Sequence, residues 1–307
     1  MLNRVHARRR SFGVVWAVLI ALCVSGCGQL GPPSFGNGGS ARAHRQAQEA
    51  LDRWAAAVAA AGGQQAFVPV GELTGQIGDW EEENGQNKAA LYAGLLTAPT
   101  ALPADAPGDS EVLWDDGTTR TVGTISAAQA FEELHTTATA ECPDCTALQV
   151  MGARWSRTSV QTSRGRATAP AWEFVLAGTR VVVTQIAVAV PDRITVTPPP
   201  WDTNDTPVGV SVESATGAVG GRQMTVAFTG AQTGADKPCG ADYATEAVES
   251  STAVVVIVVE HMNWPVGGAC DDVGYRREAT VELAAPLGDR TVLEVKEGHP
   301  VPVTLTP

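Results

Sequence analysis

The chain has 307 residues, of which 44% are hydrophobic and 18% are charged, and 21 Lys and Arg stand against 33 Asp and Glu, a formal net charge of −12. This composition excludes a wholly disordered chain and a collagen-like or coiled-coil fibre, and the acidic balance argues against a nucleic-acid partner, whose phosphates require a basic face. The length predicts two domains once an export signal is subtracted, and 32 Gly with 19 Pro predict many turns and a β-rich fold.

Residues 1–26 predict an export signal. Basic residues at 4–10 precede an apolar stretch at 14–24 that is too short to span a bilayer as a helix. The sequence VSGC at 24–27 follows, and it resembles the bacterial lipobox. The resemblance implies transfer of diacylglycerol to the Cys27 sulfur and cleavage before that residue. The alternatives are an ordinary secretory signal with an incidental cysteine and a short uncleaved anchor. The sequence RRSF at 9–12 also matches the twin-arginine export pattern in part, although an ordinary basic leader is the favoured interpretation.

Cleavage before Cys27 leaves a strongly acidic body. The leader contains four Arg and no acidic residue, so the remaining chain keeps 17 basic and 33 acidic side chains, a net charge of −16. Basic residues are what attract a protein to anionic lipid headgroups, so this charge disfavours docking through side-chain charge. The lipid is therefore expected to hold the protein at the extracytoplasmic face of the cell membrane. Residues 27–40, rich in Gly, Ser and Pro, predict a flexible tether.

Residues 41–190 predict an α+β domain in which helices pack on an antiparallel sheet. The spacing of apolar residues favours helices at about 41–61, at 88–97 and from Ser126, where Gln129 completes a capping box. Alternating apolar residues and turn signals predict a hairpin and three further strands, at about 111–122, 148–161, 171–176 and 181–190.

Residues 191–207 contain three consecutive prolines and predict an extended linker, and 208–307 predict an all-β, Ig-like sandwich. The continuous apolar run at 253–259 predicts a central strand that is covered on both faces. No helix is expected in this second domain. Seven strands are expected, at about 208–214, 222–229, 243–249, 252–260, 276–284, 290–296 and 301–306.

Four cysteines remain after loss of the leader and lipidation of Cys27, and an even number in an exported protein predicts two disulfides. Three pairings are open. We favour Cys142–Cys145 and Cys239–Cys270, because each pair then lies in one domain. The first pair is also a C-x-x-C, which could be a redox site. A structural disulfide is favoured, because the residues that follow predict a strand and not the helix that lowers a thiol pKa. The histidines lack metal-ligand spacing, so neither a metal nor a cofactor is expected.

An acidic segment around Trp80 is the first candidate binding loop. Asp79, Glu81 and Glu83 surround that indole and could recognise a cation, a sugar or a partner protein. The spacing of the acids does not follow the calcium-binding loop of an EF-hand. The alternative is a solvated acidic turn with Trp80 packed into the core.

Two further candidate loops carry opposite charges. Asp115 and Asp116 could supply paired carboxylates, although Asp-Gly is also what a tight turn requires. Arg164 and Arg166 could receive an anionic group, although a solvated hairpin tip is the simpler interpretation. The sequence contains no nucleophile elbow, Ser-x-x-Lys, His-Glu-x-x-His or Walker motif, so no catalytic residue is assigned.

The segments TSRGRATAPAWEFVL at 162–176 and ELAAPLGDR at 282–290, together with the lipobox, resemble a group of lipoproteins from high-GC Gram-positive bacteria. In that group a similar segment precedes a β-rich C-terminal region. The resemblance covers most of the mature chain and implies the membrane anchor, but it implies no activity.

Two functions are consistent with these observations. The first is a non-enzymatic envelope lipoprotein that binds an envelope protein or a cell-wall component through exposed loops. The alternative is a lipid-anchored hydrolase acting on cell-wall material, with carboxylates of the 79–83 and 115–116 loops as acid and base. The second hypothesis requires these carboxylates to converge within about 5–10 Å.

Overall fold

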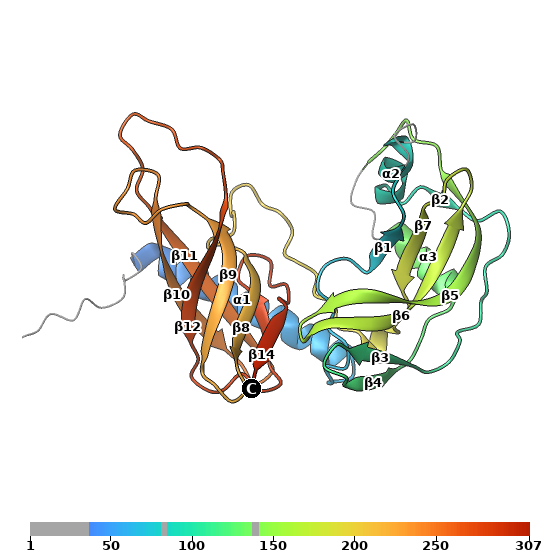
Figure 1. Cartoon of the computed structure of the whole chain (residues 1–307), viewed down its shortest axis with the longest axis horizontal. Coiled ribbons are helices and arrows are strands. Elements are labelled where there is room, and N and C mark those ends of the chain that lie inside the picture. Colours follow the sequence, from blue (N-terminus) through green and yellow to red (C-terminus); the bar gives the residue numbers. More distant parts are fainter. Residues whose placement is uncertain (1–36, 81–84, 137–140) are drawn as a thin grey trace, which may run out of the picture. The chain divides into compact units, whose positions relative to one another are not determined.

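The computed structural model describes residues 37–80, 85–136 and 141–307 (Figure 1). The predicted leader, Cys27 and most of the predicted tether lie outside these residues. The described chain is mostly β, with three sheets and three α-helices. Its first elements are α1 Asn37–Ala60, β1 Thr74–Ile77, α2 Gly85–Tyr92, β2 Leu96–Thr97, β3 Ser110–Trp114, β4 Thr119–Val122, α3 Ala127–Thr136, β5 Leu148–Thr162, β6 Gly165–Leu176 and β7 Val182–Ile186.

The first sheet is built around β6. Its strands follow the order β1-β7-β6-β3-β4, and β5 pairs antiparallel with β6 over nearly its whole length. Helix α3 covers one face of this sheet, because its apolar residues pack with Trp172 and Phe174 of β6. The predicted capping box of α3 is confirmed: Ser126 Oγ accepts from Gln129 N at 3.1 Å, and Gln129 Oε1 accepts from Ser126 N at 3.0 Å.

Two predicted elements of this region end earlier than expected. The helix predicted at 88–97 ends at Tyr92, and Leu96–Thr97 forms β2, which pairs in parallel with the start of β5. Gly94 between them has a φ of 64°, a left-handed conformation that glycine adopts readily and that stops a helix. The strand predicted at 181–190 ends at Ile186, and Val190–Asp192 forms a single 3-10 turn.

The second β region contains the seven predicted strands. They are β8 Val212–Ala218, β9 Gln223–Gly230, β10 Ala241–Glu249, β11 Ala253–Met262, β12 Tyr275–Glu282, β13 Thr291–Glu294 and β14 Val303–Thr306. They form two sheets, β10-β11-β13 and β12-β9-β8-β14. One apolar cluster joins residues of both sheets, so the sheets pack face to face in a sandwich-like arrangement. Strand β8 starts four residues later than expected, at Val212.

Strand β11 is the central strand that the apolar run predicts. Val254, Val256 and Val258 belong to the cluster between the two sheets. Val255 and Ile257 point to the opposite face of their sheet, because successive side chains of a strand alternate. All five side chains are fully buried. The prediction of a strand covered on both faces is therefore confirmed.

Helix α1 supplies the cover on that opposite face. Leu51 and Trp54 pack in one cluster with Val255, Ile257 and Leu293 of the β10-β11-β13 sheet. The side chain of Gln46 donates to the carbonyl oxygen of Val295 at 2.8 Å. The sequence groups this helix with residues 41–190, whereas most of its packing partners come from 208–307; Val68 and Ile194 complete the cluster. The helix also starts at Asn37, so the last four residues of the predicted tether are helical.

Candidate binding site

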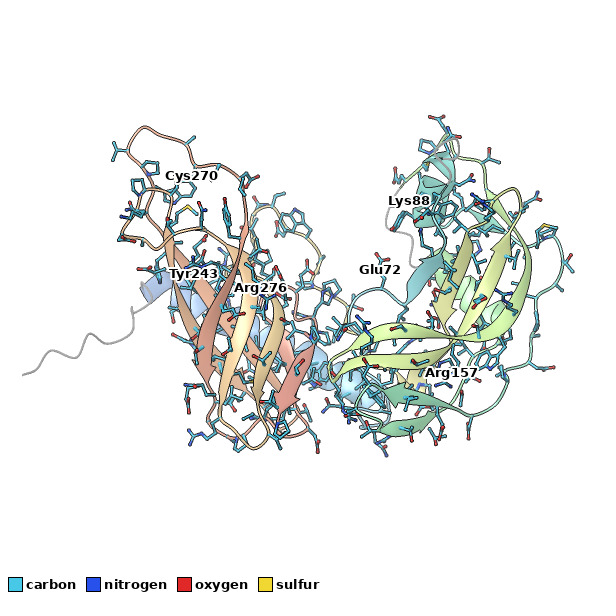
Figure 2. The ribbon with its side chains drawn as sticks, in the orientation of Figure 1. Glu72, Lys88, Arg157, Tyr243, Cys270 and Arg276 are labelled. Atoms are coloured by element: carbon cyan, nitrogen blue, oxygen red, sulfur yellow. A yellow bond between two sulfur atoms is a disulfide. The ribbon has the colours of Figure 1, made fainter. Side chains whose placement is uncertain are left out.

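Two loops at one end of the sandwich are joined by a disulfide. The β9–β10 loop (231–240) contains Cys239, and the β11–β12 loop (263–274) contains Cys270; the two sulfurs are bonded. In Figure 2 Cys270 lies in the loop beyond the strand ends, and Tyr243 lies on β10 below it. The predicted pairing of Cys239 with Cys270 is confirmed.

Backbone hydrogen bonds hold the bases of the two loops together. Cys239 N donates to the Asn263 carbonyl at 2.8 Å, and Asn263 N donates to the Gly240 carbonyl at 2.8 Å, which extends the β10–β11 pairing beyond Ala241. Only glycine fits at position 240, because a Cβ there would lie 1.9 Å from the carbonyl oxygen of Gly234. The disulfide therefore joins two loops whose bases are already held in register.

The two loops and the adjoining strand ends border a half-open cavity of about 670 Å³, a volume within the usual range of small-ligand sites. Its walls are mainly polar or expose backbone. The lining residues include Thr229, Gly230, Gln232, Thr233, Lys237, Glu260, Asp271, Asp272 and Gly274.

Tyr243 lies beside the cavity and links its walls. The Tyr243 hydroxyl accepts a hydrogen bond from Ala231 N at 2.6 Å and donates to Glu260 Oε1 at 2.8 Å. The Tyr243 ring packs against Phe228, with the ring centroids 4.7 Å apart. Burial and the neighbouring Glu260 carboxylate raise the pKa of Tyr243 above its ordinary 10.0, against the lowering influence of Ala231 N–H and Arg277. The phenol therefore stays protonated at neutral pH and acts as a donor to Glu260.

We expect Tyr243→Phe to lower the free energy of unfolding by about 1–3 kcal/mol, because Ala231 N–H and Glu260 each lose a partner. The pKa of Tyr243 is raised in the folded state, so its contribution to stability is complete below pH 10 and is lost as the pH rises through the folded-state pKa. The alkaline loss of stability should accordingly be smaller in this variant than in the wild type.

Urea denaturation between neutral pH and the alkaline range tests this expectation. Tyr275→Phe is the matched control, because Tyr275 is exposed and no hydrogen bond of its hydroxyl is found among the described residues. Equal alkaline slopes for wild type and Tyr243→Phe would contradict the assignment.

Several polar side chains of the cavity wall are free to meet a ligand. Within the described chain the side chains of Gln232, Thr233, Asp271 and Asp272 have no hydrogen-bond partner, and Lys237 makes only an exposed ion pair with Asp236 at 3.6 Å. The wall thus offers amide, hydroxyl, carboxylate and ammonium groups. No group of three or more His, Cys, Asp or Glu in the described ranges is placed to hold a metal ion. The arrangement suits hydrogen bonding to a polar ligand.

No family model, no curated protein and no solved structure matches this chain. In the part of the chain that the structure describes, none of the helices combines the length and apolar character needed to cross a bilayer.

The structure brings two of the three predicted binding loops together. The Asp115–Asp116 turn joins β3 to β4, and it lies against the β5–β6 turn: Asp115 N donates to the Arg166 carbonyl at 3.1 Å. The Arg164 guanidinium lies 4.8 Å from the centre of the Trp114 ring. The polar groups of these two turns therefore interact mainly with each other.

The Asp116 carboxylate accepts hydrogen bonds from within its own turn. The donors are the Thr118 hydroxyl at 2.6 Å and Thr118 N at 2.8 Å. These bonds lower the pKa of Asp116, with a smaller contribution from the charge of Arg164. This agrees with the interpretation of Asp-Gly as a turn.

The acidic loop around Trp80 lies elsewhere in the sheet. Glu81 and Glu83 fall outside the described residues, but Asp79 and Trp80 follow β1, which pairs with β7 at the edge opposite β3 and β4. Ile77 of β1 pairs with Val182 of β7, and Val182 pairs with Val175 of β6. Strand β3 instead pairs with β6 at Ala167. Those two points are roughly 26 Å apart along the strand. Asp79 and the Asp115–Asp116 turn therefore do not form the acid–base pair that the hydrolase alternative requires.

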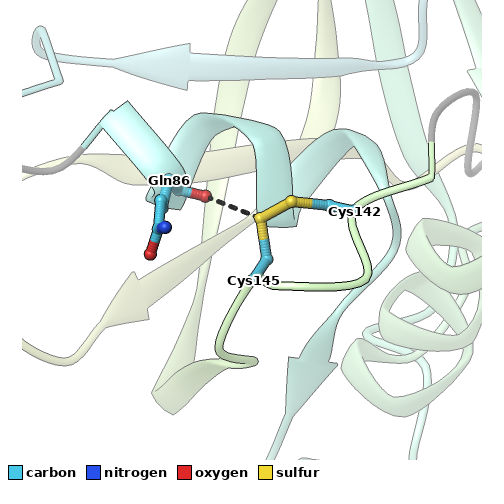
Figure 3. The surroundings of a disulfide bond; sticks show 3 residues. All are labelled: Gln86, Cys142 and Cys145. Atoms are coloured by element: carbon cyan, nitrogen blue, oxygen red, sulfur yellow. Dashed lines mark hydrogen bonds between the residues drawn. A yellow bond between two sulfur atoms is a disulfide. The ribbon is translucent and has the colours of Figure 1, made fainter.

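The Cys142–Cys145 disulfide is also present, as predicted, and precedes strand β5 (Figure 3). Cys145 Sγ lies 3.5 Å from the carbonyl oxygen of Gln86 in α2. The residues that follow form a strand from Leu148, so this C-x-x-C does not open a helix, whose N-terminus would lower the thiol pKa.

Sequence reasoning missed most of the cavity. The pairing of Cys239 with Cys270 was the one signal that joined its two loops. Tyr243 and Glu260 carry no motif, and they meet only because they are directly opposite in the β10–β11 register.

Proposed function

We propose that this protein is a lipid-anchored, extracytoplasmic binding protein that takes a polar cell-wall component into the cavity between its disulfide-linked loops. The observation that carries the proposal is the cavity of about 670 Å³, whose wall presents unpartnered hydrogen-bonding side chains. The protein would act by binding and not by catalysis, with its site held outside the membrane by the lipid on Cys27.

The compartment is supported independently of the cavity. Two disulfides are characteristic of proteins that reside in oxidising, extracytoplasmic environments. The VSGC sequence at 24–27 follows a basic and an apolar segment in the order expected of a lipoprotein signal. The resemblance to lipoproteins of high-GC Gram-positive bacteria supports the same anchor.

The polarity of the wall argues for the ligand class. A purely apolar ligand would bury Gln232, Thr233 and the two aspartates against carbon, and each unpaired polar group costs free energy. Hydroxyl, amide and amine groups of wall glycans and peptides would instead pair with them. A cell-wall component is therefore a better match to this cavity than an apolar molecule.

We also propose finer fold assignments. Strands β8–β14 would be a variant of the Ig-like sandwich, because β8, β9 and β12 are neighbours as the first, second and fifth strands of that fold are. The parallel pairing of β11 with β13 departs from the usual Ig order. The packing of α3 on the sheet around β6 supports an N-terminal α+β domain.

Co-sedimentation with purified Gram-positive cell walls tests the proposed binding. The lipidated chain in detergent is expected to pellet with the walls. The triple variant Gln232→Ala/Asp271→Ala/Asp272→Ala should bind about tenfold or more weakly, because each lost charge-assisted hydrogen bond is worth about 1.5–3 kcal/mol.

The matched control is Gln149→Ala/Asp105→Ala/Asp109→Ala, which makes the same changes in composition and charge at exposed residues outside the cavity. It should bind like the wild type. Equal binding of the two triple variants, or no wall binding by the wild type, would overturn the cavity assignment.

The anchor has its own test. Mass spectrometry of the membrane-extracted protein is expected to find an N-terminal Cys27 that carries diacylglycerol. Cys27→Ser should release the protein from the membrane fraction, and an unmodified wild-type Cys27 would refute the anchoring.

A further inference from the structure

Exposed apolar side chains gather at the outer part of the 263–274 loop. Trp264 is 67% exposed, Val266 is completely exposed, and Val273 is 54% exposed. Trp264 and Val266 do not line the cavity, which begins nearer the base of the loop. We call Trp264, Pro265 and Val266 the apolar tip.

The loop keeps this tip away from the core. Gly268 N donates to the Pro265 carbonyl at 3.3 Å, which closes a turn immediately after Trp264. On the other side of the turn, Cys270 is bonded to Cys239. The tip therefore lies between two held positions, Asn263, which pairs with Gly240, and Cys270, which is bonded to Cys239.

The length of chain between Cys27 and α1 limits how far the proposed anchor can be from this helix. Helix α1 starts at Asn37, ten residues after Cys27, so these two residues are at most about 35 Å apart. The first turns of α1 lie beside β10, where His44 Nε2 is 2.5 Å from Glu246 Oε2. Ala241, at the loop end of β10, is about 17 Å along the strand from Glu246.

The chemistry of the tip suits a bilayer interface. Tryptophan has an apolar body and one polar N–H, and it is enriched at the headgroup level of membranes. The charged residues around the loop include three basic side chains, Lys237, Arg276 and Arg277, of which Arg277 donates to the carbonyl oxygen of Gln232 at 2.9 Å. The carboxylates outnumber them, and they are Asp236, Asp242, Glu260, Asp271 and Asp272. Attachment at this point would depend on apolar burial and not on attraction to anionic lipids.

We propose that the apolar tip docks into the interface of the membrane to which Cys27 is anchored. The proposal rests on the proposed function only for that anchor. Docking adds a second, side-chain contact to the lipid and so orients the sandwich relative to the membrane.

Fluorescence quenching tests the docking. The lipidated chain is reconstituted into phosphatidylcholine vesicles whose acyl chains carry bromine, which quenches tryptophan fluorescence on contact. We expect Trp264→Phe to remove most of the quenching. Trp201→Phe is the matched control, because Trp201 is 75% exposed and lies in the 191–207 segment; this variant should keep the wild-type quenching.

Two further measurements sharpen the test. Val266→Asp should reduce the quenching of Trp264 while the circular dichroism spectrum stays unchanged, since Val266 makes no contribution to the core. Addition of phosphatidylglycerol to the vesicles should not increase the quenching. Quenching that is equal in Trp264→Phe and wild type, or that appears only with anionic lipid, overturns the proposal. The mass of the Cys27 adduct, measured on the same sample, reports separately whether the anchor itself fails.

Discussion

Replacement of Trp54 by alanine is expected to lower the free energy of unfolding by about 3–5 kcal/mol, because it empties a fully buried site between α1 and the β10-β11-β13 sheet. Trp54 is among the largest completely buried side chains of the described chain. The loss should affect the sandwich and not only the helix, since Val255, Ile257 and Leu293 belong to the same cluster.

Trp54→Phe is the informative companion to this variant. The indole Nε1 of Trp54 is buried and has no hydrogen-bond partner among residues 37–80, 85–136 and 141–307. Phenylalanine removes that unpaired donor, which recovers about 1–3 kcal/mol and offsets much of the cost of the smaller ring. We therefore expect a change in stability close to zero.

Urea denaturation of both variants, followed by circular dichroism, measures the two effects. A cost of Trp54→Ala below about 1 kcal/mol would contradict the packing of α1 on this sheet. A large cost of Trp54→Phe would show that the indole N–H has a partner after all.

The double variant Cys239→Ser/Cys270→Ser is expected to be about 4 kcal/mol less stable than the wild type. The two cysteines are 31 residues apart in sequence. In the chain-entropy model a disulfide stabilises a protein by restricting its unfolded chain, and the effect increases with the logarithm of the number of residues in the loop that it closes. The same variant should lose wall binding, because the two loops that line the cavity are no longer joined.

Cys142→Ser/Cys145→Ser provides the matched comparison. Its cysteines are three residues apart, so the same model gives a loss of about 2 kcal/mol. Wall binding should be unaffected, since this disulfide does not line the cavity. Denaturation curves with and without reductant check both values. Equal losses, or a larger loss for the 142–145 pair, would contradict the chain-entropy explanation.

The local elements of this protein were largely predictable. Ser126 and Gln129 form the expected capping box, because the spacing of a cap is a property of one helical turn. The apolar run at 253–259 forms a central strand, because a strand whose two faces are both apolar is buried only when a layer covers each face. The predicted end of the second helix was less accurate. Gly94 has a left-handed backbone, which ends α2 and allows Leu96 to join a strand.

The candidate site was predictable only in part. The Cys239–Cys270 pair indicated which loops are linked, but not that Tyr243 stands opposite Glu260 or that Gln232 faces a cavity. The acidic residues Asp79 and Asp115 looked equivalent in the sequence, since both lie next to a tryptophan. The strand order of the sheet placed them at opposite edges.

The sequence by itself indicated most of the elements, the presence of two disulfides and the acidic character of the body, because periodicity, turn chemistry and cysteine number act over short distances or over the whole composition. Tertiary structure alone decided that α1 covers the C-terminal sheet, that two loops border a half-open cavity, and that Asp79 and Asp115 lie at opposite edges of their sheet. These outcomes depend on which apolar faces meet when residues far apart in the chain come together. The apolar stripe of α1 can pack on any complementary sheet, and only the folded arrangement selects Val255 and Ile257 as its partners.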